Sequence, residues 1–255
     1  MNRHFSSFVV MFALFAAVFA CCDKSGEASP CALDLLSEPI VEFQLLETVS
    51  INGILHLQFD YDSQRRIAQI RWFAENGELG GAEIFTYNDA GNLISIAYSN
   101  GETKSFEKAG NRIYRENSKE KLSYFELDEQ GRITAEYSQS SRSDEYSFSS
   151  VSEYEYRDGN LIKVVSEQNY AYPDEALAIK DVSAYVYDDK KSPFFHCETP
   201  KWLLKTLGMD IKNNMLSYNS ESVRYSYTYD NSGFALTRTN LKEGYTEEYI
   251  YTKIK

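Results

Sequence analysis

The sequence predicts an all-β protein: an antiparallel meander of about seven hairpins that is strongly curled or barrel-like. Three features favour this fold class. A short unit of two aromatic residues, an Asx-Gly turn and an aliphatic residue recurs along the chain, apolar and polar residues alternate inside the strand-like runs, and no helical pattern separates those runs. One exception, near residues 200–207, has the pattern of a short helix.

The clearest copy of the repeated unit runs from Phe85 to Leu93. Phe85 and Tyr87 are two residues apart, so an extended strand places both rings on one face and Thr86 on the other. The Asn, Asp and Gly residues that follow favour a chain reversal, because Asx side chains bond nearby amides and glycine accepts a positive φ. Each unit is therefore predicted to form a hairpin. The seven copies begin at Phe59, Phe85, Phe106, Phe125, Tyr154, Tyr185 and Tyr227.

The spacing of the copies indicates how the hairpins are arranged. Successive copies begin 19 to 42 residues apart, which favours a meander over a solenoid or propeller, whose stacked units need a constant length. From Val223 to Tyr229 apolar and polar residues alternate, as in a strand with one buried and one wet face. Two strands per copy give ~14 strands, which an open sheet rarely carries without curling. We expect the sheet to curl around its aromatic face.

Residues 200–207 carry helix signals. Thr199 stands at the N-cap position, Pro200 at the first helical position and Gly208 at the stop. We interpret this helix as a plug that lays Trp202 and neighbouring leucines over one end of the sheet. A lid over a ligand is the alternative interpretation.

The first 20 residues have the pattern of a signal peptide, with Arg3 near the start and an apolar run from residue 8 to residue 20. That run of roughly 13 residues is too short to span a bilayer, which takes ~20. The pattern resembles a bacterial lipoprotein signal, which implies cleavage before Cys21 and lipidation of Cys21, with Cys22 as the alternative acceptor. Residues 1–20 are thus expected to be the signal peptide, 21–30 a lipidated tether and 31–255 a single β domain. The expected location is the cell envelope, at the outer membrane.

Composition and motifs argue against several functions. The formal net charge is −12 and no Lys/Arg cluster is present, which disfavours nucleic-acid binding. The sequence contains no nucleophile elbow, metalloprotease helix, phosphate loop or Cys-x-x-Cys pair. His196 and Cys197 are adjacent, so on an extended chain their side chains point apart. We therefore expect no catalytic residues, no metal and no cofactor.

Acidic residues cluster where the hairpins turn. They are Asp60, Asp62, Asp188, Asp189 and Asp230. Asx side chains commonly cap turns, so we interpret these residues as turn caps and not as calcium ligands or a glycosidase pair.

Two pairs of residues remain as candidates for special roles. Cys31 and Cys197 are the cysteines beyond the lipidation signal, and export would allow a disulfide between them to persist. Two separately buried thiols are the alternative. Trp72 and Trp202 lie outside the repeated aromatic positions and are candidates for a platform that stacks on a ligand such as a glycan. Helix packing explains Trp202 equally well.

Two resemblances accompany these patterns. The units from Phe85 to Leu93 and from Tyr227 to Gly233 are similar to the tyrosine-aspartate repeats of large secreted shell-forming proteins. A closer resemblance, over about residues 40–255, is to a family of uncharacterised lipoproteins from Gram-negative gut bacteria, a domain of unknown function with a porin-like fold. The signal, the aromatic hairpins and the stretch from Tyr187 to Phe194, followed later by Asn213-Asn214, carry this resemblance.

The second resemblance implies a curled antiparallel sheet on the cell envelope and transfers no catalytic residues. A true porin is not expected, because residues 106–145 carry dense charged and polar side chains where a lipid-facing strand needs an apolar face. The sequence favours a non-enzymatic envelope lipoprotein that binds a glycan, a peptide or an outer-membrane protein. A structural or assembly lipoprotein without a small-molecule ligand and a carboxylate-dependent hydrolase are the alternatives.

Overall fold

The computed structural model describes residues 42–115, 123–143, 146–172, 176–219 and 222–254. These residues form one antiparallel sheet of sixteen strands and one short helix. Neighbouring strands in the sheet are also neighbours in the sequence, except that β1 and β16 pair with each other. The predicted all-β antiparallel meander is confirmed.

The strands of the first half are β1 (Phe43–Ile51), β2 (Ile54–Tyr61), β3 (Ile67–Phe73), β4 (Leu79–Tyr87), β5 (Leu93–Tyr98), β6 (Thr103–Ala109), β7 (Arg112–Arg115) and β8 (Tyr124–Leu127). The second half contains β9 (Ile133–Ser143), β10 (Tyr146–Arg157), β11 (Asn160–Ala171), β12 (Ala176–Tyr187), α1 (Lys201–Thr206), β13 (Met215–Tyr218), β14 (Tyr225–Tyr229), β15 (Ala235–Asn240) and β16 (Thr246–Ile254).

The seven repeated units fall on the even-numbered strands from β2 to β14. The predicted number of about seven hairpins is nevertheless too small. β1 and β16 lie outside the units, and they pair with each other from Phe43 opposite Ile254 to Ile51 opposite Glu247. This pairing joins the first and last strands, which the local turn signals did not indicate.

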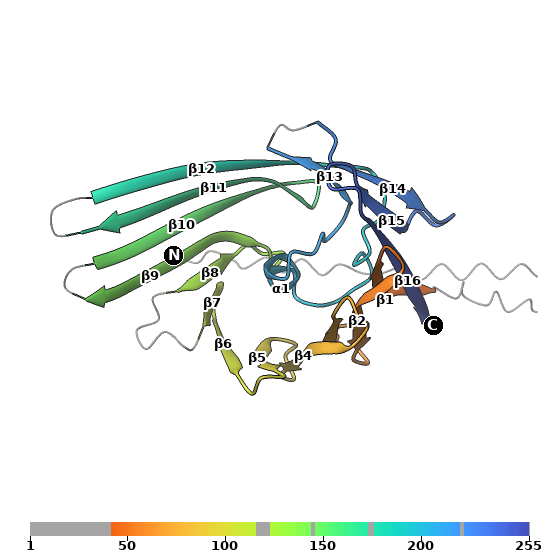
Figure 1. Cartoon of the computed structure of the whole chain (residues 1–255). Helices are drawn as coiled ribbons and strands as arrows, with labels where there is room; N and C mark the ends of the chain where they lie inside the picture. Colours follow the sequence, from red (N-terminus) through yellow and green to blue (C-terminus); the bar gives the residue numbers. More distant parts are fainter. Residues whose placement is uncertain (1–41, 116–122, 144–145, 173–175, 220–221, 255) are drawn as a thin grey trace, which may run out of the picture. The chain divides into compact units, whose positions relative to one another are not determined.

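The sheet curls until its two edge strands, β13 and β14, approach each other. The amide of Arg224 donates to the carbonyl of Leu216 at 2.9 Å, and the hydroxyl of Tyr227 donates to the carbonyl of Met215 at 2.8 Å. The result is a nearly closed barrel whose strands wrap around α1 (Figure 1).

The inward face of the barrel carries the core. Phe59, Phe85 and Phe125, the first aromatic residues of their units, are 3%, 5% and 1% exposed. Thr86, next to Phe85, is exposed. Burying each phenylalanine ring stabilises the fold by about 1.5–3 kcal/mol.

The two-faced strand predicted from the alternation is confirmed within β14, where Tyr225 is 8% exposed and Ser226 and Thr228 face solvent. Val223 was wrongly included in its buried face, because it precedes the strand and is 58% exposed.

The second aromatic residue of a unit contributes through its hydroxyl. Tyr61 donates to the carbonyl of Leu46 at 2.8 Å, and Tyr87 donates to the carbonyl of Ile67 at 2.9 Å. Both acceptors stand at register shifts in their strands. A bulge disrupts the ladder of backbone hydrogen bonds, and the tyrosine hydroxyls supply donors at these positions.

Acidic residues cap several of the turns, as the sequence predicted. Oδ1 of Asp62 accepts hydrogen bonds from the amides two and four residues later, at 2.9 and 3.0 Å. Asp230 repeats this pattern at 2.8 and 2.9 Å. Asp60 is different, because it forms an ion pair with Arg71 between β2 and β3 instead of capping the turn.

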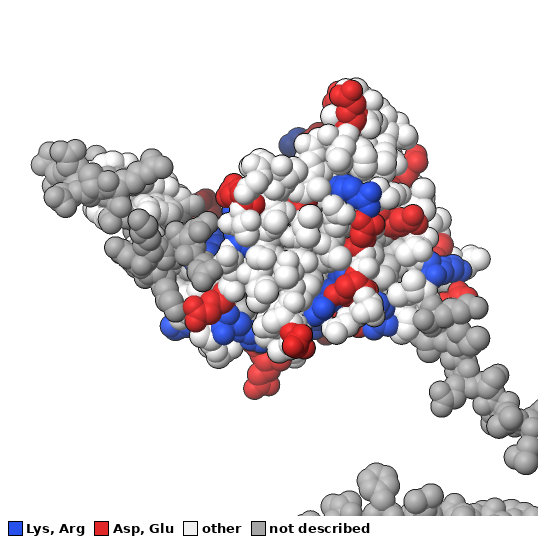
Figure 2. Space-filling view, turned by 90° about the horizontal axis from the view of Figure 1, so that it is seen from below, with Lys and Arg blue, Asp and Glu red and all other residues white. Residues whose placement is uncertain are grey.

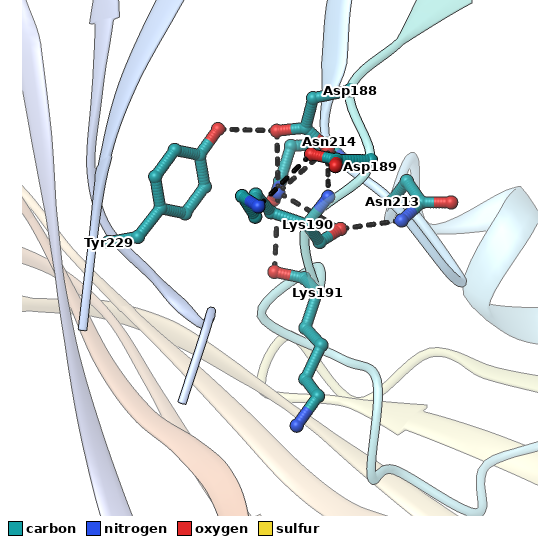
Figure 3. A network of polar contacts seen from close by, with 7 residues as sticks. All are labelled: Asp188, Asp189, Lys190, Lys191, Asn213, Asn214 and Tyr229. Atoms are coloured by element: carbon teal, nitrogen blue, oxygen red, sulfur yellow. Dashed lines mark hydrogen bonds and ion pairs between the residues drawn. The ribbon is translucent and has the colours of Figure 1, made fainter. Parts of the chain in front are cut away.

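Residues 188–214, which we call the plug, leave the sheet after β12 and carry α1. Asp188 joins the two ends of the plug (Figure 3). Its carboxylate accepts hydrogen bonds from the amides of Lys190 and Asn214, both at 3.0 Å, from Nδ2 of Asn214 at 3.0 Å and from the hydroxyl of Tyr229 on β14. One carboxylate thus closes the loop and ties it to the barrel edge.

The helix lies close to its predicted position and buries Trp202, Leu203 and Leu204. Its N-cap residue is Pro200, with no side-chain cap, so the expected capping role of Thr199 is wrong. The hydroxyl of Thr199 instead accepts a hydrogen bond from the amide of Ile67 at 2.7 Å, which holds the plug against β3. In the described part of the chain, no helix has the length and apolarity needed to cross a membrane.

We predict that Asp188→Ala lowers the free energy of unfolding by about 2–4 kcal/mol, because the buried Asn214 and the half-buried Tyr229 lose a charged acceptor. Asp189 is the matched control, since its side chain is 85% exposed. Asp189→Ala is expected to change stability by less than about 0.5 kcal/mol. Urea titration of both variants measures the difference, and equal losses would contradict the role of Asp188 in holding the plug.

Candidate functional site

The plug leaves cavities toward both ends of the barrel. A cavity of about 470 Å³ lies at the Asx-Gly turns, where Gly131, Gly159 and Lys108 line it. Two others, of about 400 and 370 Å³, both border Leu207. Lys104 lines the first of these two and stands at the opposite end of β6 from Lys108. We call the cavity of about 400 Å³ the mouth cavity and that of about 370 Å³ the side cavity.

The floor of the mouth cavity is aromatic. The rings of Phe106 and Phe125 lie 5.5 and 5.8 Å from the ring of Trp202, measured between centroids. Trp202 borders the cavity but is only 4% exposed, because α1 packs it into the core. The packing interpretation therefore accounts for the position of Trp202, and stacking on a ligand stays a prediction for the part of the ring that borders the cavity.

Charged side chains surround this aromatic floor. Nζ of Lys104 lies 4.7 Å from the ring centroid of Tyr98, and the guanidinium of Arg115 lies 4.5 Å from that of Phe125. Desolvation raises the pKa of Glu83, and Lys104 opposes part of this effect. The mouth cavity thus presents one carboxylate and two cations next to apolar rings. Such a set can bind a ligand that has both an apolar face and several hydrogen-bonding groups.

The side cavity has a more buried polar lining. Arg238 on β15 forms an ion pair with Glu247 on β16, and the hydroxyl of Tyr249 donates to Glu247 at 2.6 Å. Nε of Arg238 and Oδ1 of Asn214 are buried and have no hydrogen-bond partner among the described residues. Both residues line the cavity, so it offers one donor and one acceptor to a small molecule or to water.

Asp210 also lines the side cavity, and no sequence motif marked it. Its Oδ2 accepts a hydrogen bond from the amide of Met215 at 3.2 Å. Burial raises the pKa of Asp210 to about 6, although this hydrogen bond and the charges of Arg238 and Lys205 favour the ionised form. A lone aspartate two residues after a glycine gives no local signal of such an environment. Its burial depends on contacts between distant segments.

The structure places one of the two candidate disulfide cysteines. The thiol of Cys197 donates to Oγ1 of Thr199 at 3.2 Å, and burial raises its pKa, which disfavours the reactive thiolate. Cys31 lies outside the described residues, so the disulfide stays a prediction. Cys21, the expected lipidation site, also lies outside them.

His196 and Cys197 do not form a catalytic pair. Nδ1 of His196 accepts a hydrogen bond from the amide of Gln44 at 3.0 Å, while the thiol of Cys197 is bonded elsewhere. Burial lowers the pKa of His196, aided by the charges of Lys191 and Arg65. Within the described ranges, no three His, Cys, Asp or Glu side chains converge to hold a metal ion.

Trp72 lies apart from Trp202. Its ring lies over the backbone of Gly81 on β4, so close that a Cβ at this glycine would be 2.5 Å from Cζ2 of the indole. Trp72 is half-buried and lines none of the three cavities. The two tryptophans therefore do not form a joint platform, and a binding role for Trp72 alone stays a prediction.

The charges on the surface are mixed. Figure 2 shows Lys and Arg interspersed with Asp and Glu on the face seen from below, between wide areas of other residues. This face offers no extended cationic area of the kind that a phosphate backbone needs.

Asp210 provides a test of the interior electrostatics. Its pKa of about 6 is about 2 above that of an ordinary aspartate, a difference worth about 2–3 kcal/mol. The folded protein binds this proton more tightly than the unfolded chain, so the stabilising contribution of the protonated group is lost as the pH rises from about 4 to about 6.

We predict that Asp210→Asn removes this pH dependence. Between pH 4 and pH 7, the unfolding free energy of the variant should rise relative to wild type by about 2 kcal/mol. Denaturant titrations at both pH values measure this change. Asp62 and Asp128 have the opposite effect on the pH dependence of stability, because hydrogen bonds lower their pKa values despite desolvation. Both residues are present in the variant and in wild type, so their effect cancels in the comparison. Parallel stability profiles for the two proteins would contradict a raised pKa at Asp210.

No protein-family model matches the sequence, and no curated protein matches it. Among solved structures, the chain is similar to the crystal structure of a porin-like protein from Bacteroides uniformis ATCC 8492, with 14% identity, 83% of this chain and 97% of that chain covered, and a TM-score of 0.36. The crystal structures of TcdB2-TccC3-TEV and TcdB2-TccC3 are similar at 9% and 11% identity, with TM-scores of 0.25 and 0.20. These alignments cover 78% and 76% of this chain but 14% and 10% of those chains. A porin-like protein is thus among the structural neighbours, and the resemblance to tyrosine-aspartate repeats is not confirmed.

Proposed function

We propose that this protein is a non-enzymatic binding module of the cell envelope and that its ligand occupies the mouth cavity. One observation carries the proposal: a cavity of about 400 Å³ combines an aromatic floor with charged groups of both signs. A concave, largely apolar site with a few convergent polar groups is the usual form of a ligand pocket.

The lining favours a short glycan or a peptide. A sugar ring has an apolar face that fits against the aromatic floor, and its hydroxyl groups can bond to Glu83 and Lys104. A peptide offers the same combination through its side chains and amide groups. The cavity is lined mainly by residues of strands and of α1, so we expect little ordering of the protein to oppose binding.

Two lysines of one strand can test whether the ligand binds in the mouth cavity. Lys104 and Lys108 are both exposed and both on β6, but Lys104 lines the mouth cavity and Lys108 lines the cavity at the opposite end. Lys104→Ala, combined with Glu83→Gln, is expected to weaken binding of a retained glycan or peptide at least about tenfold, because charge-assisted hydrogen bonds are lost. Lys108→Ala is expected to bind like wild type. Trp202 is a poor target, since its truncation would damage the core.

Titration calorimetry against envelope and dietary glycans and against peptide libraries measures this binding. Equal weakening by the Lys104 and Lys108 variants would contradict a site at the mouth cavity. Product formation that a single Asp or Glu substitution abolishes would instead identify a hydrolase. The absence of any saturable ligand would favour a structural or assembly role.

The envelope location rests on the proposed lipid anchor at Cys21. We expect labelled fatty acid to be incorporated into wild type, and Cys21→Ser to release the protein from the membrane fraction. Cys22→Ser is the matched control and should remain lipidated. Incorporation that depends on Cys22 alone would assign the anchor to that residue.

A further inference from the structure

β12 extends well beyond the strand that follows it in the sheet. β13 pairs only with the segment from Tyr185 to Tyr187, whereas β12 begins at Ala176. β11 covers the other side of β12 from Ala176 to Ala184 without a register shift. Residues 176–183 are therefore a free strand edge with respect to the described residues, and Figure 1 shows β12 reaching past β13.

The backbone groups on this edge can be assigned. The amide of Ala184 donates to Oδ1 of Asn219 at 3.2 Å, and its carbonyl accepts from the amide of Asn219 at 2.8 Å. Both groups of Ala184 thus point away from β11. Alternate residues of a strand point the same way, so the backbone N–H and C=O groups that face the open edge belong to Ala176, Ala178, Lys180 and Val182.

Apart from Lys180 and Asp181, the side chains along this edge do little to block another strand. Leu177 and Ile179 are 48% and 40% exposed, and Val182 on the other face is 54% exposed. Natural sheets protect free edges with proline, bulges or charged residues, and residues 176–183 contain neither proline nor a register shift. Lys180, the one cation in this stretch, is engaged with Glu167 at 2.5 Å.

We propose that residues 176–183 form a β-augmentation site for an extended strand of a partner protein, one that carries apolar side chains and a basic residue. Main-chain hydrogen bonds to the four free N–H and C=O pairs supply affinity, and alternate side chains supply specificity. Apolar partner residues would meet Leu177 and Ile179, and the basic residue would lie opposite Asp181. This site is separate from the mouth cavity and does not depend on the proposed function.

The charges favour a basic partner strand over a second copy of this chain. Glu167 already neutralises Lys180, whereas Asp181 has no ion pair with a described residue. An antiparallel two-fold pairing centred on Asp181 would set opposite each other two carboxylates without ion-pair partners among the described residues, which destabilises a sheet. The formal net charge of −12 further opposes self-association.

The test uses the full-length protein and three synthetic nine-residue peptides with blocked ends. The first alternates Thr and Val around a central Lys, the second has Glu in place of Lys, and the third is the Lys peptide with alternate amides N-methylated. The Lys peptide is expected to slow hydrogen exchange at the four edge amides at least tenfold. The Glu peptide should bind less tightly, and the N-methylated peptide should not protect these amides.

Ala178→Pro and Ala178→Thr are the matched variants. Proline removes an N–H that faces the open edge, so the native ladder with β11 is kept, whereas threonine retains the N–H. We expect the proline variant to bind the Lys peptide at least tenfold more weakly than the threonine variant. Exchange at β11 amides reports whether both variants are folded, and the N-methylated peptide tests the edge independently of any substitution.

Three results would overturn the proposal. They are equal binding to the two Ala178 variants when both are folded, protection by the N-methylated peptide equal to that by the Lys peptide, and no protection at millimolar peptide. A concentration-dependent dimer of the wild type that Ala178→Pro abolishes would show that the edge receives a second copy, which also contradicts the proposed partner.

Discussion

The need to fill a wide barrel governs the rest of this structure. Barrels of about sixteen strands are too wide for wall side chains to meet at the centre, and in porins they enclose an aqueous channel. Here the plug enters the interior, and its Trp202, Leu203 and Leu204 join the cluster built by inward residues such as Phe59 and Phe125. The core exists because a segment between two strands supplies the side chains that the wall lacks.

The plug itself depends on a few polar contacts at its ends. Asp188 and Asn214 stand 26 residues apart and bond to each other, and Tyr229 adds a donor from β14. Thr199 holds the middle of the plug to Ile67 on β3. These bonds replace the backbone ladder that a loop of irregular structure lacks, and together they hold α1 at a fixed depth. The cavities beside Leu207 follow from this depth, because a helix of six residues cannot fill the whole interior.

Local patterns predicted the parts of the fold that local physics decides. The spacing of Phe85, Thr86 and Tyr87 predicted which face of the strand points into the barrel, and the Asx-Gly clusters predicted the turns. Both signals are local, because strand periodicity and turn chemistry act within a few residues. The role of Thr199 was misjudged, since its partner Ile67 is 132 residues away. The pairing of β1 with β16 and the burial of Asp210 also depend on distant segments, and the mouth cavity is assembled from several strands and α1. No window of sequence contains such information.

The same insertion that fills the barrel also explains its open edge. From β1 to β12, each strand pairs with the strand that follows it in the sequence, but the chain leaves the sheet after Tyr187 and returns only at Met215. β13 then has four residues before the sheet ends, and it meets β12 only near Tyr185. A longer β13 would pair with the remainder of β12. The outer edge of β13, next to β14, would then be the edge of the sheet. A short return strand closes the barrel around the plug and leaves one edge of residues 176–183 of β12 without a described neighbour, so filling the interior and exposing a strand edge are two consequences of one segment.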